Sequence, residues 1–396
     1  MFERLKSEAK VLGKPSWRGM FQYAAELHER STHPPREPFP YPWEEIGPGY
    51  HATPAFGHWD VVHEILDTMP AEPEHAANQV LNDLAGQQED GLVPGTIYMS
   101  GEKPRWNPLV GHPPLWPVAA REYFDLTGRR DLIESCYQPL LRQIGWFEKF
   151  RKVGDNGFYY SDMLRVTYES GIDQGVRFDE PSAVPFPCVD ATSHVYQLYR
   201  HAADWSRLLG KDPTALGQKA DAIGSFIREE LFDGETGLFR DGRALKERRL
   251  AFEGMWPVVV GAAATAQAAR VIDRNLLDPR RFFTAHPISS VGVEDPKFEL
   301  RMWRGPAWNS MTYWAARGCI RYDRPDAAAR LLEKALDCSA MQFERTGTIW
   351  EFYHPHAGRP EDLQRKPETQ QNTPCRDYLG HNPLLAMARM WEKTRE

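Results

Sequence analysis

The sequence predicts an all-α fold built as a double ring of six inner and six outer helices. Two observations lead to this prediction. Strand-like pieces are short, at 157–161 and 237–240, and no βαβ alternation is present. Apolar side chains recur at i, i+3 and i+4 spacing in about eleven segments, at 17–31, 58–69, 72–89, 113–127, 131–152, 188–210, 213–232, 254–273, 307–321, 324–343 and 382–394. Helices in this number, paired by alternating short and long connections, are typical of such a ring; an irregular helical bundle or solenoid is the alternative.

Glycine, proline and aspartate mark several helix ends in order along the chain. Gly128 follows the fourth segment and Gly210 the sixth, where a left-handed residue ends a helix at low cost. Asp212-Pro213 and Asp323 to Pro325 supply first-turn signals for the next helices. We predict one domain over 1–396 with an N-terminal extension, 1–48. Its long loops, at 91–114, 165–187, 280–306 and 354–382, should carry the function.

Charge and cysteine content exclude several classes of protein. With 48 Lys and Arg against 55 Asp and Glu the net charge is −7, which argues against nucleic acid as a partner. The five cysteines are scattered and form no CxxC pair, so neither a disulfide framework nor a thiolate zinc site is expected. The charged N-terminus has no signal-peptide pattern, and 255–269 is too short and polar to span a bilayer. We expect a cytoplasmic protein with no membrane partner, no metal and no cofactor.

Aromatic residues are abundant, with 13 Trp and 15 Tyr, which suits a site that stacks on the flat faces of sugar rings. Trp146, Trp205 and Trp391 lie at helical spacing and are expected to pack in the core or on the surface. The others stand beside Gly, Pro, Arg and carboxylates. We assign these to a pocket: Trp59, Trp303 and Trp308, with Trp116 and Trp350 as further candidates.

Carboxylates among aromatic residues are the remaining chemical signal, because nucleotide, serine hydrolase and zinc protease motifs are absent. The loop 168–179 holds three carboxylates and an arginine, and desolvation there favours the protonated form that a general acid needs. The segment 347–355 places Glu351 in an aromatic run, where an unpaired charge is costly to bury. A solvated acidic turn and a paired core glutamate are the structural alternatives.

These segments, in this order, resemble glycoside hydrolase family 63 in its compact bacterial form, which includes mannosylglycerate and glucosylglycerate hydrolases. The resemblance begins near residue 50. It includes His58-Trp59-Asp60, Gln87 to Pro94, His112 to Trp116, Glu169 to Asp179, Cys188-Val189-Asp190 with Tyr196, Trp303 to Trp308 and Glu351 to Gly358. The Trp-Arg-Gly-Pro-Ala-Trp run at 303–308 is the most specific match.

The resemblance implies an (α/α)6 barrel, with long loops over one mouth, and an inverting glycosidase for α-glucosides or α-mannosides. Asp173 would be the general acid and Glu351 the general base. No cofactor is implied, and the partner is a small carbohydrate. The substrate-binding residues implied or expected are Trp59, Asp60, Gln88, Trp116, Arg177, Asp179, Trp303, Arg304, Trp308, Tyr353 and His381.

One segment departs from the family pattern. The family has Gly-Phe-x-Trp-Thr near its C-terminus, whereas this chain has Cys375 to Pro383, without a tryptophan. The substrate is therefore open, and Arg359, Lys366 and Arg376 are candidate cations for a negatively charged aglycone. A sugar epimerase on the same barrel and a non-catalytic sugar-binding protein are the alternative functions, and the oligomeric state is open.

Overall fold

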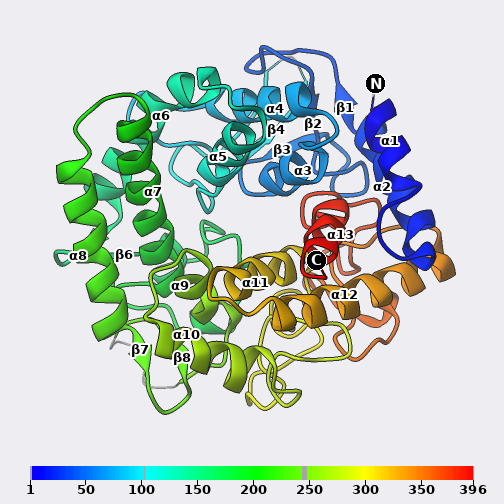
Figure 1. The fold of residues 1–396 in the computed structure, drawn as a ribbon. Helices are drawn as coiled ribbons and strands as arrows, with labels where there is room; N and C mark the ends of the chain where they lie inside the picture. The colour runs from blue at the N-terminus through cyan, green and yellow to red at the C-terminus, as the bar shows by residue number, and fades with distance from the viewer. Residues whose placement is uncertain (1, 102, 243–247, 396) are drawn as a thin grey trace.

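The computed structural model describes residues 2–101, 103–242 and 248–395 and is dominated by helices (Figure 1). The helices are α1 Glu3–Ala9, α2 Arg18–Arg30, α3 Asp60–Thr68, α4 Pro73–Ala85, α5 Trp116–Thr127, α6 Asp131–Phe150, α7 Val189–Leu208, α8 Thr214–Glu230, α9 Trp256–Val259, α10 Thr265–Val271, α11 Asn309–Arg321, α12 Pro325–Thr346 and α13 Leu384–Lys393. The strands form four antiparallel pairs, namely β1 Thr32–His33 with β2 Trp43–Glu44, β3 Ala55–Gly57 with β4 Thr96–Tyr98, β5 Lys152–Val153 with β6 Gly157–Phe158, and β7 Phe232–Asp233 with β8 Leu238–Phe239.

The helices form the predicted double ring, an (α/α)6 barrel. Six inner helices contact one another in a closed order: α3, α5, α7, α9, α11, α13 and back to α3. Their outer partners are α4, α6, α8, α10, α12 and, from the N-terminal extension, α2 (Figure 1). The last inner helix therefore pairs with a helix from the start of the chain, so the two termini close the ring together.

The predicted helix 254–273 is the main difference from the sequence prediction. It is two helices, α9 and α10, preceded by a 3₁₀ turn at Phe252–Met255. Gly261, with φ of 78°, breaks it between Val259 and Thr265, because a left-handed residue cannot continue a right-handed helix. Helix α1 carries no long periodic pattern and was not predicted.

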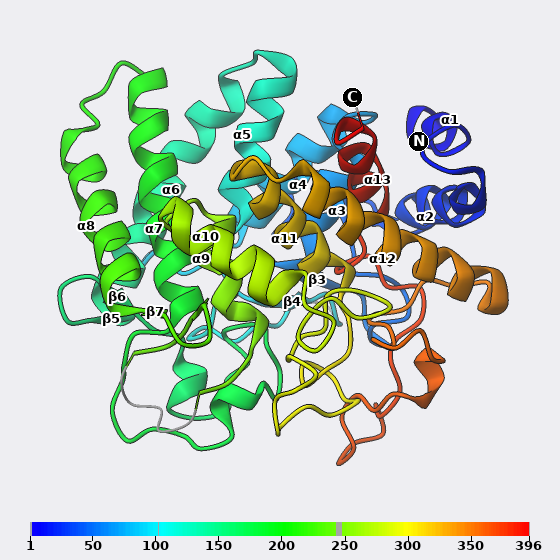
Figure 2. The same ribbon diagram turned by 60° about the horizontal axis from the view of Figure 1, so that its bottom comes forward.

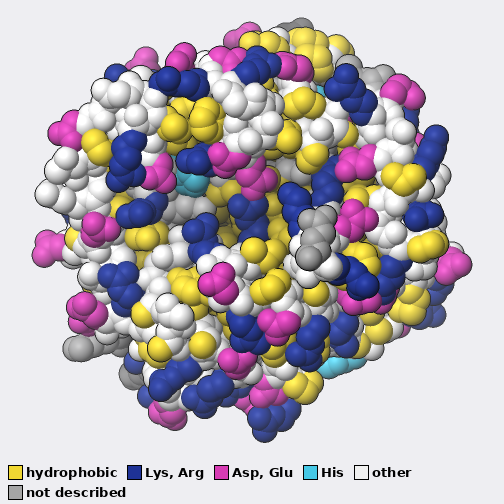
Figure 3. Space-filling model, in the orientation of Figure 1, with side chains coloured by type: hydrophobic (Ala, Val, Ile, Leu, Met, Phe, Trp, Pro, Cys, Tyr) yellow, Lys and Arg dark blue, Asp and Glu magenta, His cyan; other side chains and the backbone are white. Residues whose placement is uncertain are grey.

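The long loops gather at one end of the barrel (Figure 2). The inner helices α3, α5, α11 and α13 each begin at this end, so the residues that precede them face the loops. The opposite face is hollowed at its centre (Figure 3), where a cavity of about 660 Å³ is lined by residues that include Leu66, Glu122, Arg317, Met390 and Lys393.

The described parts of the chain contain no helix with the length and apolar character of a bilayer span. All five cysteines lie in these parts and are free thiols, three of them buried.

Candidate active site

A pocket of about 270 Å³ opens at the loop end of the barrel. Five of its lining residues lie at or just before the start of inner helices: Trp59 and Asp60 at α3, His112 before α5, Trp308 before α11, and His381 before α13. Helix N-termini present partial positive charge and free N–H groups, which suits a pocket rich in oxygen ligands. Loop residues complete the wall, and among them are Asp173 and Glu351.

Asp173 enters this pocket from a tightly fixed loop. Upstream of it, Glu169 is buried and accepts hydrogen bonds from Arg151 Nε at 2.8 Å and from the Ser161 amide at 2.6 Å. Burial raises the pKa of Asp173, while the ammonium of Lys366, 2.9 Å away, opposes the rise. The net direction is upward, which favours the protonated carboxyl.

Glu351 is held in the opposite way, by donors that stabilise a carboxylate. Its Oε2 accepts from Arg365 Nε at 2.6 Å and from the backbone N–H of Cys375 at 3.0 Å. The side chains of Glu351 and Arg365 are 2% and 3% exposed, so the ion pair is shielded from water. The pocket thus combines one carboxyl inclined to keep its proton with one carboxylate held by cationic and amide donors, as general acid and base catalysis requires.

A third carboxyl group, that of Asp60, lies in the same pocket in the first turn of α3. Burial raises its pKa to about 7, although the hydroxyl of Tyr378 donates to Asp60 Oδ1 at 2.8 Å and works against the rise. His381 Nε2 lies 3.6 Å from the same oxygen, and burial lowers the pKa of His381 well below its usual value. His381 is therefore a neutral neighbour of Asp60.

Three indole rings form one wall of the pocket. The rings of Trp303 and Trp308 are parallel, with centroids 3.7 Å apart, and Trp59 stacks on Trp303 at 5.8 Å. His381 meets all three rings edge-on. The buried Trp59 Nε1 and His112 Nδ1 have no hydrogen-bond partner in the described structure. Both atoms belong to residues of the pocket lining.

Several residues that the sequence analysis assigned to substrate lie outside the described lining of this pocket. Their polar groups are bonded elsewhere: Gln88 Nε2 to the Pro108 carbonyl, Trp116 Nε1 to Gln143, Tyr353 OH to the Trp350 amide, and the Arg304 guanidinium to Asp179, Glu299 and the Gln174 carbonyl. The ion pair of Arg304 with Asp179 instead joins the segment before α11 to the loop that carries Asp173. The further candidate Trp350 and the cations Arg359 and Arg376 also lie outside the lining, whereas Lys366 lies in it.

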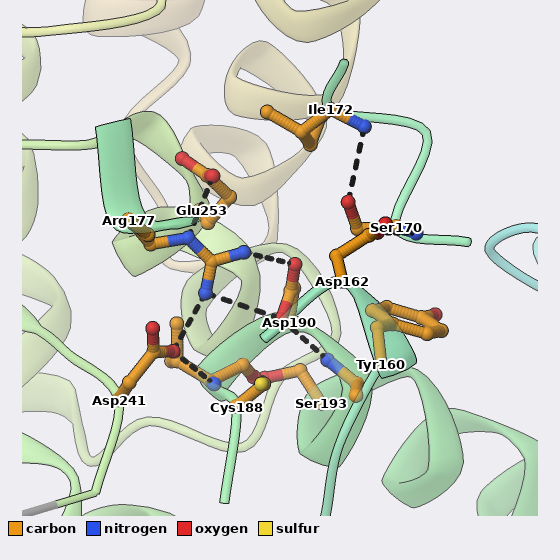
Figure 4. Close-up of polar contacts among 12 residues, drawn as sticks. Tyr160, Asp162, Ser170, Ile172, Arg177, Cys188, Asp190, Ser193, Asp241 and Glu253 are labelled. Atoms are coloured by element: carbon orange, nitrogen blue, oxygen red, sulfur yellow. Dashed lines mark hydrogen bonds and ion pairs between the residues drawn. The ribbon is translucent and has the colours of Figure 1, made fainter. Parts of the chain in front are cut away.

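Arg177 also turns away from the pocket. Its guanidinium donates to Asp190, Asp241 and Glu253 at 2.5 to 2.7 Å in a buried cluster (Figure 4). Burial raises the pKa of Glu253 to about 7, which eases the excess of negative charge around a single cation. Among the described residues, only Cys188, Asp190 and Asp241 bring potential metal ligands within 4.8 Å of one another. Arg177 already bonds both aspartates, so this cluster is a structural ion-pair network rather than a metal centre.

Sequence reasoning missed part of the lining, notably Tyr50, Tyr98, Arg365 and Tyr378. Tyr378 lies within the segment that departs from the family pattern, so that departure was a usable signal. Tyr50 precedes β3 and Tyr98 is the last residue of β4, so the β3 to β4 pairing brings them to the pocket only in three dimensions. Nothing in their local sequence distinguishes them from ordinary surface tyrosines.

Comparisons with known proteins identify the family of this chain. The family model for the mannosylglycerate hydrolase MGH1-like glycoside hydrolase domain matches residues 53–372. Mannosylglycerate hydrolase MGH1 of Selaginella moellendorffii is 24% identical over 407 residues, which cover 83% of this chain and 78% of that protein. A mannosylglycerate hydrolase of Rubrobacter radiotolerans is 25% identical over 165 residues, 40% of this chain and 36% of the relative.

Solved structures give the same fold. The family 63 mannosylglycerate hydrolase of Thermus thermophilus, in complex with glucose, superposes with a TM-score of 0.73 at 18% identity, covering 96% of this chain and all of that one. Neutral trehalase Nth1 of Saccharomyces cerevisiae superposes with a TM-score of 0.69 at 17% identity, covering 89% of this chain and 74% of that one. The family model spans most of the chain, so this protein is a glycoside hydrolase and belongs to the mannosylglycerate hydrolase MGH1-like members of glycoside hydrolase family 63.

Proposed function

We propose that this enzyme hydrolyses mannosylglycerate, an α-mannoside with an anionic aglycone, with inversion at the anomeric carbon. The observation that carries the proposal is the pocket in which Asp173 and Glu351 lie with the cations Lys366 and Arg365. The named relatives support the substrate, since the Selaginella and Rubrobacter proteins are mannosylglycerate hydrolases. The mannosylglycerate hydrolase of Thermus thermophilus has also been solved in complex with Tris and D-glycerate, which supports an aglycone of that size.

In the proposed mechanism the two carboxyl groups act on opposite faces of the anomeric carbon. Asp173, protonated, gives its proton to the glycosidic oxygen as the bond to the aglycone breaks. Glu351, ionised, takes a proton from a water molecule that attacks from the other side, and the sugar leaves with inverted configuration. After product release, Asp173 regains a proton from solvent and Glu351 loses one.

The remaining pocket residues would bind the sugar. The indole wall of Trp59, Trp303 and Trp308 would contact the apolar side of the ring, while Asp60 and His381 would bond ring hydroxyls. Lys366 would attract the aglycone carboxylate, because a charge-assisted hydrogen bond in a partly desolvated pocket is stronger than one between neutral groups. A neutral aglycone would gain nothing from that ammonium.

The test uses purified Asp173→Asn and Glu351→Gln variants with mannosylglycerate as substrate. Each substitution keeps the shape of the side chain and removes proton transfer, so kcat should fall by about 10²- to 10⁴-fold. Gln88→Ala is the matched control, because its amide bonds a backbone carbonyl outside the pocket and its loss should leave kcat close to wild type. A wild-type protein that binds mannosylglycerate by calorimetry without turning it over would contradict the proposal, as would near wild-type rates in either carboxylate variant.

A further inference from the structure

The segment 363–375, here called the cation loop, supplies a partner to each of the two proposed catalytic groups from adjacent residues. Arg365 bonds Glu351 and Lys366 bonds Asp173. Arg365 is fixed: its own N–H donates to the Asn372 carbonyl at 3.1 Å, and its Nη1 donates to the Gln371 side chain at 3.1 Å. Its side chain is 3% exposed. The pairing of Glu351 with Arg365 is therefore a permanent part of the site.

Lys366 is held less firmly. Its side chain is 20% exposed, and its ammonium lies 5.1 Å from the centre of the solvent-exposed ring of Tyr168. Asp173 is the only carboxylate among the described residues that its ammonium pairs with, at 2.9 Å. A flexible lysine at the pocket mouth can exchange one anion for another without moving the backbone, because its four-carbon stem turns freely.

This ion pair conflicts with the proposed role of Asp173. A general acid must carry a proton, whereas an ammonium 2.9 Å away stabilises the carboxylate. We propose that Lys366 is a latch that restrains the protonation of Asp173 in the empty enzyme, and that the carboxylate of an anionic aglycone opens the latch by taking the ammonium. The inference rests on the proposed function and deepens it, because it makes the negative charge of the substrate favour formation of the acid.

The proton in this step is accounted for as follows. When the substrate carboxylate pairs with Lys366, Asp173 binds one proton from solvent, and that proton then passes to the glycosidic oxygen. Burial raises the pKa of Asp173 and Lys366 restrains it, so removal of the ammonium pushes the equilibrium further toward the acid. The other charged or titratable groups that act on Asp173 are Arg365 on the cation loop, Asp162 in the 3₁₀ turn Ser161–Met163, Asp60 on α3 and Tyr50 before β3. Among these groups Arg365 is the other cation, and its side chain is 3% exposed and already paired with Glu351.

The experiment compares mannosylglycerate with mannosylglycerol, in which a neutral CH2OH replaces the carboxylate. Activity should fall at high pH as Asp173 loses its proton. In the Lys366→Met variant, the alkaline limb of kcat/KM for mannosylglycerol should move up by about one pH unit, so that rates above the limb rise about tenfold. Activity on mannosylglycerate should fall about tenfold or more, mainly through KM. In Lys366→Arg, both the position of the alkaline limb and the activity on mannosylglycerate should lie between those of Lys366→Met and the wild type.

The control is Lys152→Met, which removes a surface lysine paired with Glu148 at 2.8 Å and should change neither profile. In the wild type acting on mannosylglycerate, the alkaline limb of kcat should lie at a higher pH than the alkaline limb of kcat/KM, because the bound substrate opens the latch. With mannosylglycerol the two limbs should lie at the same pH, because this substrate has no carboxylate to open it. If the alkaline limb stays in place in Lys366→Met and only the activity on mannosylglycerate falls, Lys366 merely binds the aglycone. That result would overturn the latch and leave the proposed function standing. Loss of activity on both substrates would overturn the latch too, and a wild type inactive on both would overturn the proposed function with it.

Discussion

At the scale of single residues, the pocket is governed by how each carboxyl group is partnered. Asp60, Asp173 and Glu351 are all buried or nearly so, yet they meet different donors: a tyrosine hydroxyl, a lysine and an arginine with a backbone amide. A phenol donates one neutral hydrogen bond, so it stabilises a carboxylate less than a cation does. Asp60 therefore titrates near neutral pH, with a pKa of about 7.

Removal of the Tyr378 hydroxyl tests the role of Asp60. Tyr378→Phe deletes the donor to Asp60 Oδ1, so the pKa of Asp60 should rise and its orientation loosen. We expect KM for mannosylglycerate to rise about tenfold near pH 7, with a smaller change in kcat, since a hydrogen bond to a charged group contributes about 1.5–3 kcal/mol. Tyr159→Phe, whose hydroxyl bonds the Phe150 carbonyl, is the control. An unchanged KM in Tyr378→Phe would show that the Tyr378 to Asp60 contact has no part in binding.

The sequence predicted several residues of the pocket lining but not the direction in which nearby arginines turn. Asp173, Glu351, Trp59 and His381 were all named from the sequence, and all line the pocket. Arg177 and Arg304 were expected at sugar hydroxyls, but they bond carboxylates outside the lining. Motif spacing places an arginine near a loop; it does not determine which way the guanidinium turns, which depends on acids more than 60 residues away such as Asp241 and Glu253.

At the scale of elements, the loop that carries Asp173 is shaped by its contact with α3. Gly171 has φ of 72°, and a Cβ there would lie 2.1 Å from the ring of Trp59, the residue just before α3. No side chain fits that space. The glycine thus fixes Asp173, two residues later, at a set distance from the indole wall.

We expect Gly171→Ala to damage catalysis more than stability. The added methyl must push either Trp59 or the loop, so kcat/KM should fall by about 10²-fold, as small misplacements of a catalytic group do. Gly154→Ala is a matched control, since Gly154 has φ of 61° but open space around its Cβ. Both variants carry the same left-handed strain, about 1 kcal/mol, and only one has the clash. Equal losses of activity in the two would contradict this account.

The element boundaries that the sequence predicted best are those marked by a local residue signal such as glycine. Helix α5 ends at Gly128, which is left-handed at φ of 68°, as the glycine signal predicted. The predicted 254–273 helix was wrong in its middle, because apolar residues in both α9 and α10 keep the helical spacing across the break. Periodicity alone does not reveal that a continuous apolar pattern belongs to two short helices rather than one.

At the scale of the whole molecule, a buried ion-pair cluster joins the N-terminal extension to the first inner helix of the ring. His28 on α2 is fully buried between Glu44 of β2 and Asp67 of α3, with Nε2 3.1 Å from Asp67 Oδ2. Burial lowers the pKa of His28, but the two carboxylates outweigh it and raise the pKa to about 9. The histidine is therefore a cation that ties the N-terminal extension to the barrel.

This ion-pair cluster should make stability depend on pH. The folded pKa of about 9 lies above the ordinary 6.5, so its contribution is complete below about pH 6.5 and is lost as the pH rises through 9. His28→Gln should lower the free energy of unfolding by about 3 kcal/mol at pH 6 and by much less at pH 9.5, measured by denaturant titration. His356→Gln, at an exposed histidine, is the control. An equal loss at both pH values would mean that His28 stabilises by packing alone.

The proposed stereochemistry is also a property of the whole barrel, because Asp173 and Glu351 come from loops on different parts of the ring and meet only when it closes. If they act as acid and base on opposite faces of the sugar, the first mannose released from the α-linked substrate must be the β-anomer. Proton NMR spectra recorded early in the reaction, before mutarotation, should show the β anomeric signal growing first and the α signal following at the rate of mutarotation. A large excess of enzyme keeps hydrolysis faster than mutarotation, and free α-mannose in the same buffer gives that rate as the control. Early appearance of α-mannose would mean that one carboxylate attacks carbon directly, and the role proposed for Glu351 would then change from base to nucleophile.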